Sequence, residues 1–357
     1  MNRAPVLFRV DAAPRPGWEP LTRCLALASA LQRRRRPAHF LGRLEPATLA
    51  PAVKRGGNEW LPLASETAGG ADDLDETLRE LRRLKPAAVV VDHPEIGEEY
   101  LAALRRTGVL VVSFDTLAQV RFASRLVVNP LLGPTKVAYE FERGTQLLLG
   151  ARYALVRPEI RRLRPMRAQE PIPPFRALVA LGDDDPNNQS GELARCLLNC
   201  PKVARVDVAV RPWHPHLEAL RQLAESSAER LEVVCEPGET ATRVARCHFA
   251  VTAGNAWSLE LACVGVPQLL IVQSETHWPT AQRLEEEGAA TCLGWHANVS
   301  TATLRQAVNQ MLTTAEDRQA LARAGRKLID GRGPDRLVTA LEVLLRPALR
   351  EVVKEAA

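Results

Sequence analysis

The chain has 357 residues, which is enough for about two domains at roughly 100–200 residues per domain. Hydrophobic residues make up 46% and charged residues 25%, which is close to the average of soluble globular proteins and excludes a disordered chain. The net charge of +5 is small for this length, and aromatic residues make up only 4%, whereas nucleic-acid-binding proteins combine clustered basic residues with aromatic ones. We therefore predict no nucleic-acid partner.

The seven cysteines form no C-x-x-C pair, and most lie within apolar runs, so we expect them to be reduced core residues. No run reaches the roughly 18 apolar residues that a membrane-spanning helix needs, and no secretory signal precedes the first predicted strand. These features predict a cytoplasmic protein with no integral membrane segment.

Strand-like and helix-like segments alternate over residues 1–155. The predicted strands are 6–10, 60–63, 87–92, 109–114 and 125–129, and the predicted helices are 21–36, 72–84 and 97–106. Strands that alternate with helices of this length pair in parallel through right-handed crossovers, so we predict a Rossmann-like domain. Four arginines, 33–36, end the first helix, where cations suit the helix dipole; an anion-binding patch is the alternative.

Residues 156–175 contain five prolines and no apolar periodicity, which predicts an extended linker. The alternation then restarts and predicts a second Rossmann-like domain over residues 176–334, followed by a C-terminal helix and charged tail over 335–357. Two such domains joined by one linker form the GT-B arrangement, an α/β fold. We expect its ligand cleft between the two sets of strand carboxyl ends.

The segment AGNAWSLEL, residues 253–261, is the strongest candidate for a ligand site. It follows a predicted strand at 249–251 and leads into a helix. Gly254 and Asn255 can present backbone N–H groups and the positive end of the helix dipole to a phosphate, and Glu260 can accept hydrogen bonds from a ribose diol. The alternatives are a tight turn in which Asn tolerates positive φ, and a helix-surface acid at Glu260.

Several short motifs match a known family in their spacing. They are Arg9, Asp11, Gly17, Arg23, Cys24, Leu25, Leu27 and Ala28 near the N-terminus, VVVDH ending at His93, SFD ending at Asp115, VNP ending at Pro130, GARYALVRPE at 150–159, the segment 253–261, and GRG at 331–333. On these residues the chain resembles the UDP-sugar hydrolases of pseudaminic-acid biosynthesis, which act on UDP-2,4-diacetamido-2,4,6-trideoxy-β-L-altropyranose, and related spore-coat polysaccharide proteins. That family is itself similar to the glycosyltransferase that adds GlcNAc in peptidoglycan assembly.

The resemblance implies a UDP-sugar ligand, no cofactor, and attack of water on the anomeric carbon with release of UDP. The family's expected base is the histidine of a G-H pair, but this chain has Glu19 and Pro20 there, and proline cannot accept a proton. The family's G-G-S-D-P loop reads G-D-D-D-P, so Asp183 and Asp184 lie where a diphosphate is expected. Each carboxylate would repel it by about 1 kcal/mol at 4 Å in a water-like dielectric.

Three residues are candidates for the missing base: Asp11, Glu19 and His93. Asp11 follows the first strand, where a turn-forming aspartate is the alternative. Glu19 is a carboxylate whose pKa a cleft could raise, although a surface glutamate is the commoner outcome. His93 follows a strand-ending aspartate, and its alternative is a buried, hydrogen-bonded histidine.

The second predicted domain supplies the remaining candidates. His277 begins a helix and is a candidate anion contact. Gly17, Gly182 and Asp185 are candidate residues of the cleft loops. Successive acids in a strand-end loop rarely point at one ion, and the remaining histidines lack metal-ligand spacing, so we predict no metal.

The chain contains no P-loop, G-x-G-x-x-G or G-x-S-x-G motif, which excludes kinases, NAD enzymes and serine hydrolases that depend on them. The leading prediction is a UDP-sugar hydrolase-like protein of surface-polysaccharide or nonulosonate sugar biosynthesis. The first alternative is a catalytically impaired relative that binds a nucleotide sugar or a protein partner. The second is a GT-B glycosyltransferase, in which a sugar or lipid hydroxyl replaces water.

Overall fold

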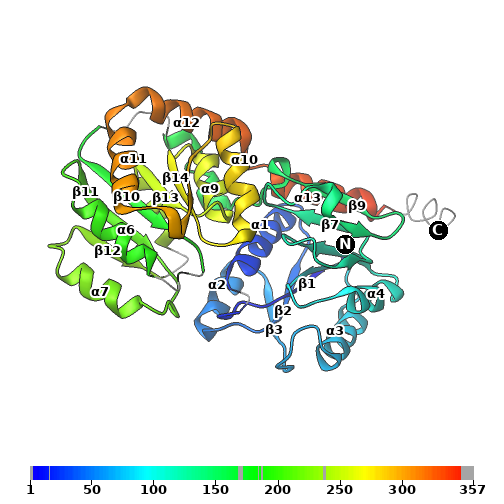
Figure 1. The fold of residues 1–357 in the computed structure, drawn as a ribbon. Helices are drawn as coiled ribbons and strands as arrows, with labels where there is room; N and C mark the ends of the chain where they lie inside the picture. Colours follow the sequence, from blue (N-terminus) through cyan, green and yellow to red (C-terminus); the bar gives the residue numbers. More distant parts are fainter. Residues whose placement is uncertain are drawn as a thin grey trace. The chain divides into compact units, whose positions relative to one another are not determined.

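The computed structural model describes residues 3–15, 17–167, 172–183, 185, 188–235 and 239–346. The chain divides into two compact units (Figure 1). The N-terminal domain consists of Met1–Arg157 together with Arg332–Ala357, and the C-terminal domain consists of Pro158–Gly331. The last part of the chain therefore returns to the domain in which the chain begins.

The N-terminal domain is built on a parallel sheet in the order β3-β2-β1-β4-β5-β7-β9. Its strands are β1 (Val6–Val10), β2 (Ala38–Gly42), β3 (Glu59–Pro62), β4 (Ala88–Asp92), β5 (Leu110–Phe114), β7 (Leu126–Asn129) and β9 (Gln146–Leu149). The central strands are buried on both faces and rich in β-branched residues, as expected for a parallel sheet covered by helices. A separate two-stranded sheet pairs β6 (Arg121–Phe122) with β8 (Glu140–Phe141).

Helices cover both faces of this sheet (Figure 1). Helices α3 (Ala71–Leu84) and α4 (Glu98–Arg106) pack on the face that carries Leu7, Val89 and Val91. Helix α1 (Glu19–Arg33) packs against β1 outside that core, and α13 (Gly333–Leu344) packs against α1. The short α2 (Ala50–Arg55) packs against β3.

The C-terminal domain contains a parallel sheet in the order β12-β11-β10-β13-β14-β15. Its strands are β10 (Phe175–Ala180), β11 (Val203–Ala209), β12 (Leu231–Val234), β13 (Phe249–Thr252), β14 (Gln268–Val272) and β15 (Thr291–Trp295). The chain runs outward in one direction from β10 and then in the other from β13. This reversal is the topological switch point at which open α/β sheets bind ligands.

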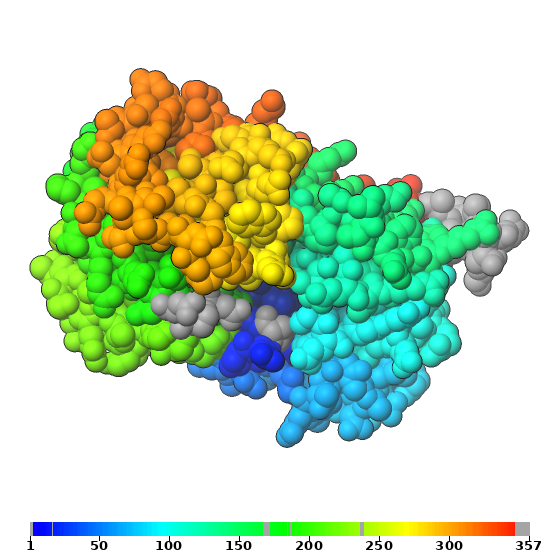
Figure 2. Space-filling model, viewed as in Figure 1, coloured from blue at the N-terminus to red at the C-terminus, as the bar shows by residue number. Residues whose placement is uncertain are grey.

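Helices α6 (Gln189–Leu198), α7 (Leu217–Glu225) and α11 (Thr301–Thr313) cover one face of this sheet through a shared apolar core. On the other face, α8 (Thr240–Arg246) contacts β10, and α9 (Ala256–Val264) lies between β13, β14 and α12 (Ala315–Leu328). Helix α10 (Trp278–Glu286) follows β14 and contacts β15. Its atoms, yellow in Figure 2, reach the surface beside the orange atoms of the chain that follows.

The described part of the predicted linker differs from an extended chain. Residues Pro158–Arg161 form α5, and Arg164–Arg167 form a 3₁₀ turn. The guanidinium of Arg164 donates to the carbonyl oxygens of Cys263, Arg326 and Ile329 at 2.6, 2.7 and 2.8 Å. These carbonyls belong to the carboxyl ends of α9 and α12, where cations are stabilising, so this segment is fixed to the C-terminal domain.

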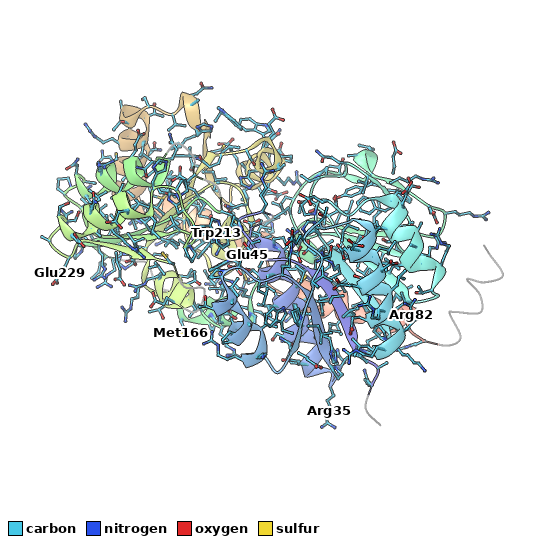
Figure 3. All side chains as sticks on the ribbon, turned by 90° about the horizontal axis from the view of Figure 1, so that it is seen from below. Arg35, Glu45, Arg82, Met166, Trp213 and Glu229 are labelled. Atoms are coloured by element: carbon cyan, nitrogen blue, oxygen red, sulfur yellow. The ribbon has the colours of Figure 1, made fainter. Side chains whose placement is uncertain are left out.

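The arginine cluster at the end of α1 connects that helix to α13. Arg33 pairs with Asp335 at 2.5 Å, and Arg36 pairs with Glu342 at 3.2 Å. Arg35 has a positive φ of 55° and extends away from the domain (Figure 3). Two of the four arginines are therefore already paired with acids of the same domain, which leaves fewer free cations for the alternative of an anion-binding patch. Among the described residues, no helix is long and apolar enough to cross a membrane.

Candidate functional site

A buried ion cluster lies below the carboxyl end of β1. Arg9 donates to Asp11 Oδ1 at 2.7 Å and to both carboxylate oxygens of Asp73 at 2.8 and 2.7 Å, and all three side chains are fully buried. Burial alone would raise the pKa of Asp11, but the contact with His93 and the charge and hydrogen bonds of Arg9 hold it well below its usual range. Asp11 is therefore an ionised, fully engaged carboxylate, which suits a structural role better than that of a base.

His93 follows β4 and faces the same cluster. Its Nδ1 accepts from the amide of Glu95 at 3.2 Å, and its Nε2 lies 3.3 Å from Asp11 Oδ2. The side chain is only 3% exposed. The structure thus brings two of the predicted catalytic residues together, with both ring nitrogens of the histidine facing protein atoms. This geometry matches the alternative of a buried histidine.

Glu19 lies in the first turn of α1, and the following Pro20 is buried. Four residues after Glu19, Arg23 binds Asp92 through two hydrogen bonds of 2.6 and 2.5 Å. Gly17 closes the loop before α1: its amide donates to the carbonyl of Ala13 at 2.9 Å, and its φ of 87° favours glycine.

Asp115 is an acid of this sheet edge to which the sequence analysis assigned no role. It directly follows β5, is partly exposed, and accepts from the amides of Leu117 and Ala118 at 3.0 and 2.7 Å. Burial raises the pKa of Asp115 despite those amides and a hydrogen bond with Tyr139. A partly exposed carboxyl whose pKa is raised suits proton transfer better than the fully buried, ion-paired Asp11 does. Two signals in the sequence were its position immediately after a predicted strand and its place in the SFD motif shared with the resembled family.

A narrow hollow of about 10 Å³, which has room for about one water molecule, lies over the carboxyl ends of β10, β11 and β12 in the C-terminal domain. Its lining residues are Gly182, Ala209, Val210, Arg211, Val234, Cys235, Thr240 and Trp257. Thr240 and Trp257 come from the first turns of α8 and α9. The hollow therefore combines apolar walls with a cation, a hydroxyl group and two helix amino termini, a composition typical of small-ligand sites.

The acids beside this hollow are largely compensated within the domain. Asp183 pairs with Arg211. Asp185 accepts from the amides of Gln189 and Ser190 at the start of α6, each at 2.7 Å, and lies 3.4 Å from His214 Nε2. Burial would raise the pKa of Asp185, but His214 and these amides lower it. Asp184 lies outside the described residues. The repulsion expected from Asp183 is therefore smaller than for an unpaired carboxylate.

Asn255 joins the end of β10 to the start of α9. Its Oδ1 accepts from the amide of Trp257 at 3.2 Å, and its Nδ2 donates to the carbonyl of Leu181 at 3.0 Å. The alternative that Asn255 adopts a positive φ is wrong, because its φ is −108°. Gly182 has a φ of 113°, and a Cβ there would lie only 2.6 Å from Asn255 Nδ2. The hollow therefore needs glycine at position 182.

Gly254 supplies the positive φ at this corner, 79°. Its amide donates to Ser258 Oγ at 3.0 Å, and a Cβ at Gly254 would come within 2.7 Å of the Ala281 side chain. The backbone amide of Gly254, which we predicted to bind a phosphate, therefore already donates its hydrogen bond to a side chain of α9. Contact between Gly254 or Asn255 and a ligand stays a prediction.

Glu260 is 5% exposed within α9, so the alternative of a helix-surface acid is wrong. Its contact with a ribose stays a prediction. His277 immediately precedes α10, and burial lowers its pKa to about 4, although the charge of Asp183 acts in the opposite direction. At neutral pH His277 is uncharged, so it can offer an anion a hydrogen bond but no positive charge. Within the described ranges, no group of three or more His, Cys, Asp or Glu residues is arranged to hold a metal ion.

The chain is similar to known proteins in sequence and in fold. No protein-family model matches the chain. Spore coat polysaccharide biosynthesis protein SpsG of Bacillus subtilis is 25% identical over 272 residues, which cover 75% of this chain and 79% of that protein. The resemblance to spore-coat polysaccharide proteins is therefore supported, whereas the specific hydrolase family stays a prediction.

Two solved structures are similar over almost the whole chain. MurG of Acinetobacter baumannii has a TM-score of 0.63 at 15% identity and covers 95% of this chain and 99% of its own. The spinosyn rhamnosyltransferase SpnG complexed with thymidine diphosphate has a TM-score of 0.63 at 18% identity and covers 95% and 100%. The chain has the GT-B fold. The predicted fold class is confirmed, and at these identities the likeness shows the fold alone.

Proposed function

We propose that this protein is a nucleotide-sugar-dependent glycosyltransferase of polysaccharide assembly, whose C-terminal domain binds the nucleoside diphosphate of the sugar donor. The observation that carries the proposal is the hollow at the carboxyl ends of β10, β11 and β12, next to the switch point of a GT-B fold. The likeness to SpsG and to a rhamnosyltransferase complexed with thymidine diphosphate supports the same ligand class.

The residues around the hollow suit a UDP group chemically. Arg211 offers a planar guanidinium for the diphosphate, Thr240 offers a hydroxyl group, and the amino terminus of α9 beside Trp257 offers a positive dipole. Asp183, paired with Arg211, competes with the diphosphate for that guanidinium. Asn255 and Gly182 position the corner without requiring direct contact with the ligand.

In the proposed reaction, a hydroxyl oxygen of the acceptor forms the new bond to the anomeric carbon, while the bond from that carbon to the diphosphate oxygen breaks and UDP leaves. The hydroxyl proton passes to a carboxylate of the N-terminal domain, for which we propose Asp115. Helix amino termini and Arg211 stabilise the charge that develops on the departing diphosphate.

Hydrolysis is the second candidate, because the N-terminal motif from Arg9 to Ala28 resembles the UDP-sugar hydrolases. It differs from transfer only in the nucleophile, which is water. Against it, the expected base position is Pro20, and both Asp11 and His93 are engaged by protein atoms. A binding protein without catalysis is the remaining alternative.

One experiment separates the three. The full chain is incubated with UDP-N-acetylglucosamine, UDP-glucose or TDP-glucose, with and without a mixture of uncharged oligosaccharide acceptors, and the products are followed by ³¹P NMR and chromatography. Release of nucleoside diphosphate only with acceptor, with a lengthened saccharide, supports transfer. Release without acceptor, with equimolar reducing sugar, supports hydrolysis instead. Binding without release under either condition contradicts both enzyme functions.

A further inference from the structure

A second hollow lies at the outer edge of the C-terminal sheet. It is an open depression of about 290 Å³ beside the carboxyl ends of β14 and β15, lined by Glu275, Trp278, Pro279 and Trp295. All four residues belong to the C-terminal domain. The surrounding surface appears in Figure 2 where the yellow atoms of α10 meet the orange atoms that follow β15. No step of the proposed function uses these residues.

Both tryptophans present aromatic surface at this hollow. Trp278 begins α10 and is 44% exposed, one of the few large apolar side chains with that exposure among the described residues. Trp295 ends β15 and packs its ring 4.9 Å from that of His296 at an interplanar angle of 43°. Pro279 fixes the backbone at the start of α10 next to Trp278. Indole rings on such fixed elements lose little conformational entropy when a ligand covers them.

The polar content of the hollow narrows the class of ligand. The carboxylate of Glu275 is its one charged lining group, so the site repels phosphate groups and acidic lipids. A purely apolar partner would remove water from that carboxylate without replacing its hydrogen bonds, which is costly. An uncharged sugar suits both the aromatic surface and the carboxylate of this hollow. Its C–H face packs on an indole ring, and its hydroxyl groups donate hydrogen bonds to the carboxylate.

The position of this hollow separates it from the nucleotide hollow. The sheet order places β14 and β15 on the opposite side of β13 from β10, β11 and β12. Both hollows nevertheless lie at the carboxyl ends of parallel strands of the same sheet. The two hollows have no lining residue in common, although His277, between Glu275 and Trp278 in the chain, feels the charge of Asp183 beside the first hollow.

We propose that Trp278 and Trp295 form a binding site for an uncharged sugar unit of a glycan chain. The carboxylate of Glu275 accepts hydrogen bonds from the hydroxyl groups of that sugar. The site itself stands without the proposed function; only its use, to hold the polysaccharide that the enzyme extends, rests on it. Stacking on two tryptophans gives the site affinity for saccharides. Glu275 favours ligands whose hydroxyl groups donate hydrogen bonds.

The test uses the full chain and two uncharged probes, chitotetraose and cellotetraose, at millimolar concentration. ¹⁵N-indole NMR of the six tryptophans reports which rings respond, and calorimetry gives the affinity. We expect the signals of Trp278 and Trp295 to shift, and Trp278→Ala or Trp295→Ala to weaken binding about tenfold. Glu275→Gln should weaken it by about threefold. Trp60→Phe, in the N-terminal domain, is the matched control and should leave binding unchanged.

Three results would overturn the proposal: no response to either saccharide, a response confined to other tryptophans, or self-association of the wild type that Trp278→Ala abolishes, which would identify the hollow as a protein interface. UDP titration of each variant keeps this test separate from the proposed function. Unchanged UDP affinity in variants that lose saccharide binding supports two independent sites. UDP binding without any saccharide response rejects the glycan site alone.

Discussion

Two carboxylates at the same edge of the N-terminal sheet have opposite surroundings. Asp11 is fully buried and bound by Arg9, which keeps it ionised. Asp115 is partly exposed, and burial raises its pKa without a directly paired cation. The paired Asp11 is held ionised and serves to hold structure, whereas the raised pKa and partial exposure of Asp115 suit exchange of a proton during a reaction.

Replacing Asp115 tests its role as base. Asp115→Asn keeps an oxygen acceptor for the amides of Leu117 and Ala118, so we expect the fold to survive. The turnover number for UDP release should fall by about 10²–10⁴-fold while KM changes little, because a general base acts in the transition state. The acid limb of the pH profile, produced by protonation of Asp115, should disappear. Thr116→Ala is the control, and unchanged turnover in Asp115→Asn would remove Asp115 from the reaction.

His277 predicts a pH dependence of stability. Burial lowers its pKa to about 4 from 6.5 in the unfolded chain, so between these values the unfolded state binds a proton that the folded state does not. Its contribution is therefore fully present above pH 6.5 and is lost as pH falls toward 4, on the order of 1 kcal/mol per pH unit. Urea unfolding at several pH values should show a steeper decline for wild type than for His277→Gln. His296→Gln should behave as wild type, and equal slopes for wild type and His277→Gln would contradict this account.

The sequence could name these residues but not their roles. Asp11 and His93 each follow a predicted strand and belong to motifs shared with the resembled family, and the structure does bring them together. Their engagement depends on Arg9 and on Asp73, which is 64 positions from Arg9 and has no sequence signal that links them. The pKa of Asp115 likewise depends on its burial and on a hydrogen bond with Tyr139, 24 positions later in the chain, which its place after a strand does not reveal.

At the scale of elements, Arg164 shows how one side chain fixes a segment that lacks periodicity. It donates to three carbonyl oxygens at the carboxyl ends of α9 and α12. Arg164→Lys replaces a planar fork by a single ammonium group, so we expect a loss of about 2 kcal/mol in the free energy of unfolding, measured in urea. Arg162→Lys, an exposed neighbour, should change it by less than about 0.5 kcal/mol. Equal stability of the two variants would contradict the role of Arg164 in fixing this segment to α9 and α12.

Apolar periodicity predicted most strands and helices, because buried parallel strands such as β1, β4 and β10 read as short apolar runs. It missed β2, whose five residues include a histidine and a glycine beside Pro37. The prediction of an extended linker was wrong for residues 158–167, where prolines and the absence of apolar periodicity suggested an extended chain. Their helical turns are held by carbonyl groups more than 90 positions away, as the contact between Arg164 and Cys263 shows.

At the scale of the whole molecule, α13 belongs to the N-terminal domain although it follows the C-terminal domain in the sequence. Leu337 in α13 is fully buried, so Leu337→Ala should reduce stability by about 2–5 kcal/mol. Hydrogen exchange should accelerate in α1, which α13 covers, and not in the C-terminal domain. Val343→Ala, at a residue 39% exposed, is the control. Faster exchange in the C-terminal domain instead would contradict this assignment.

The alternation of strands and helices was enough to predict two Rossmann-like domains and the GT-B fold, because that pattern allows few topologies. It could not locate the hollow of the C-terminal domain, which is assembled from Gly182, Arg211, Thr240 and Trp257 on separate elements. The predicted residues Gly254 and Asn255 proved to build the corner beside it. Pairing of Asp183 with Arg211, which decides the charge of the hollow, also required the folded chain.

The central claim is that the hollow over β10, β11 and β12 binds a nucleoside diphosphate, and calorimetry of the full chain with UDP tests it most directly. We expect UDP to bind, Arg211→Gln to weaken binding by about tenfold or more, and Asp183→Asn to strengthen it by removing the competing carboxylate. Absence of binding at millimolar UDP, or equal affinity of wild type and both variants, would contradict the claim.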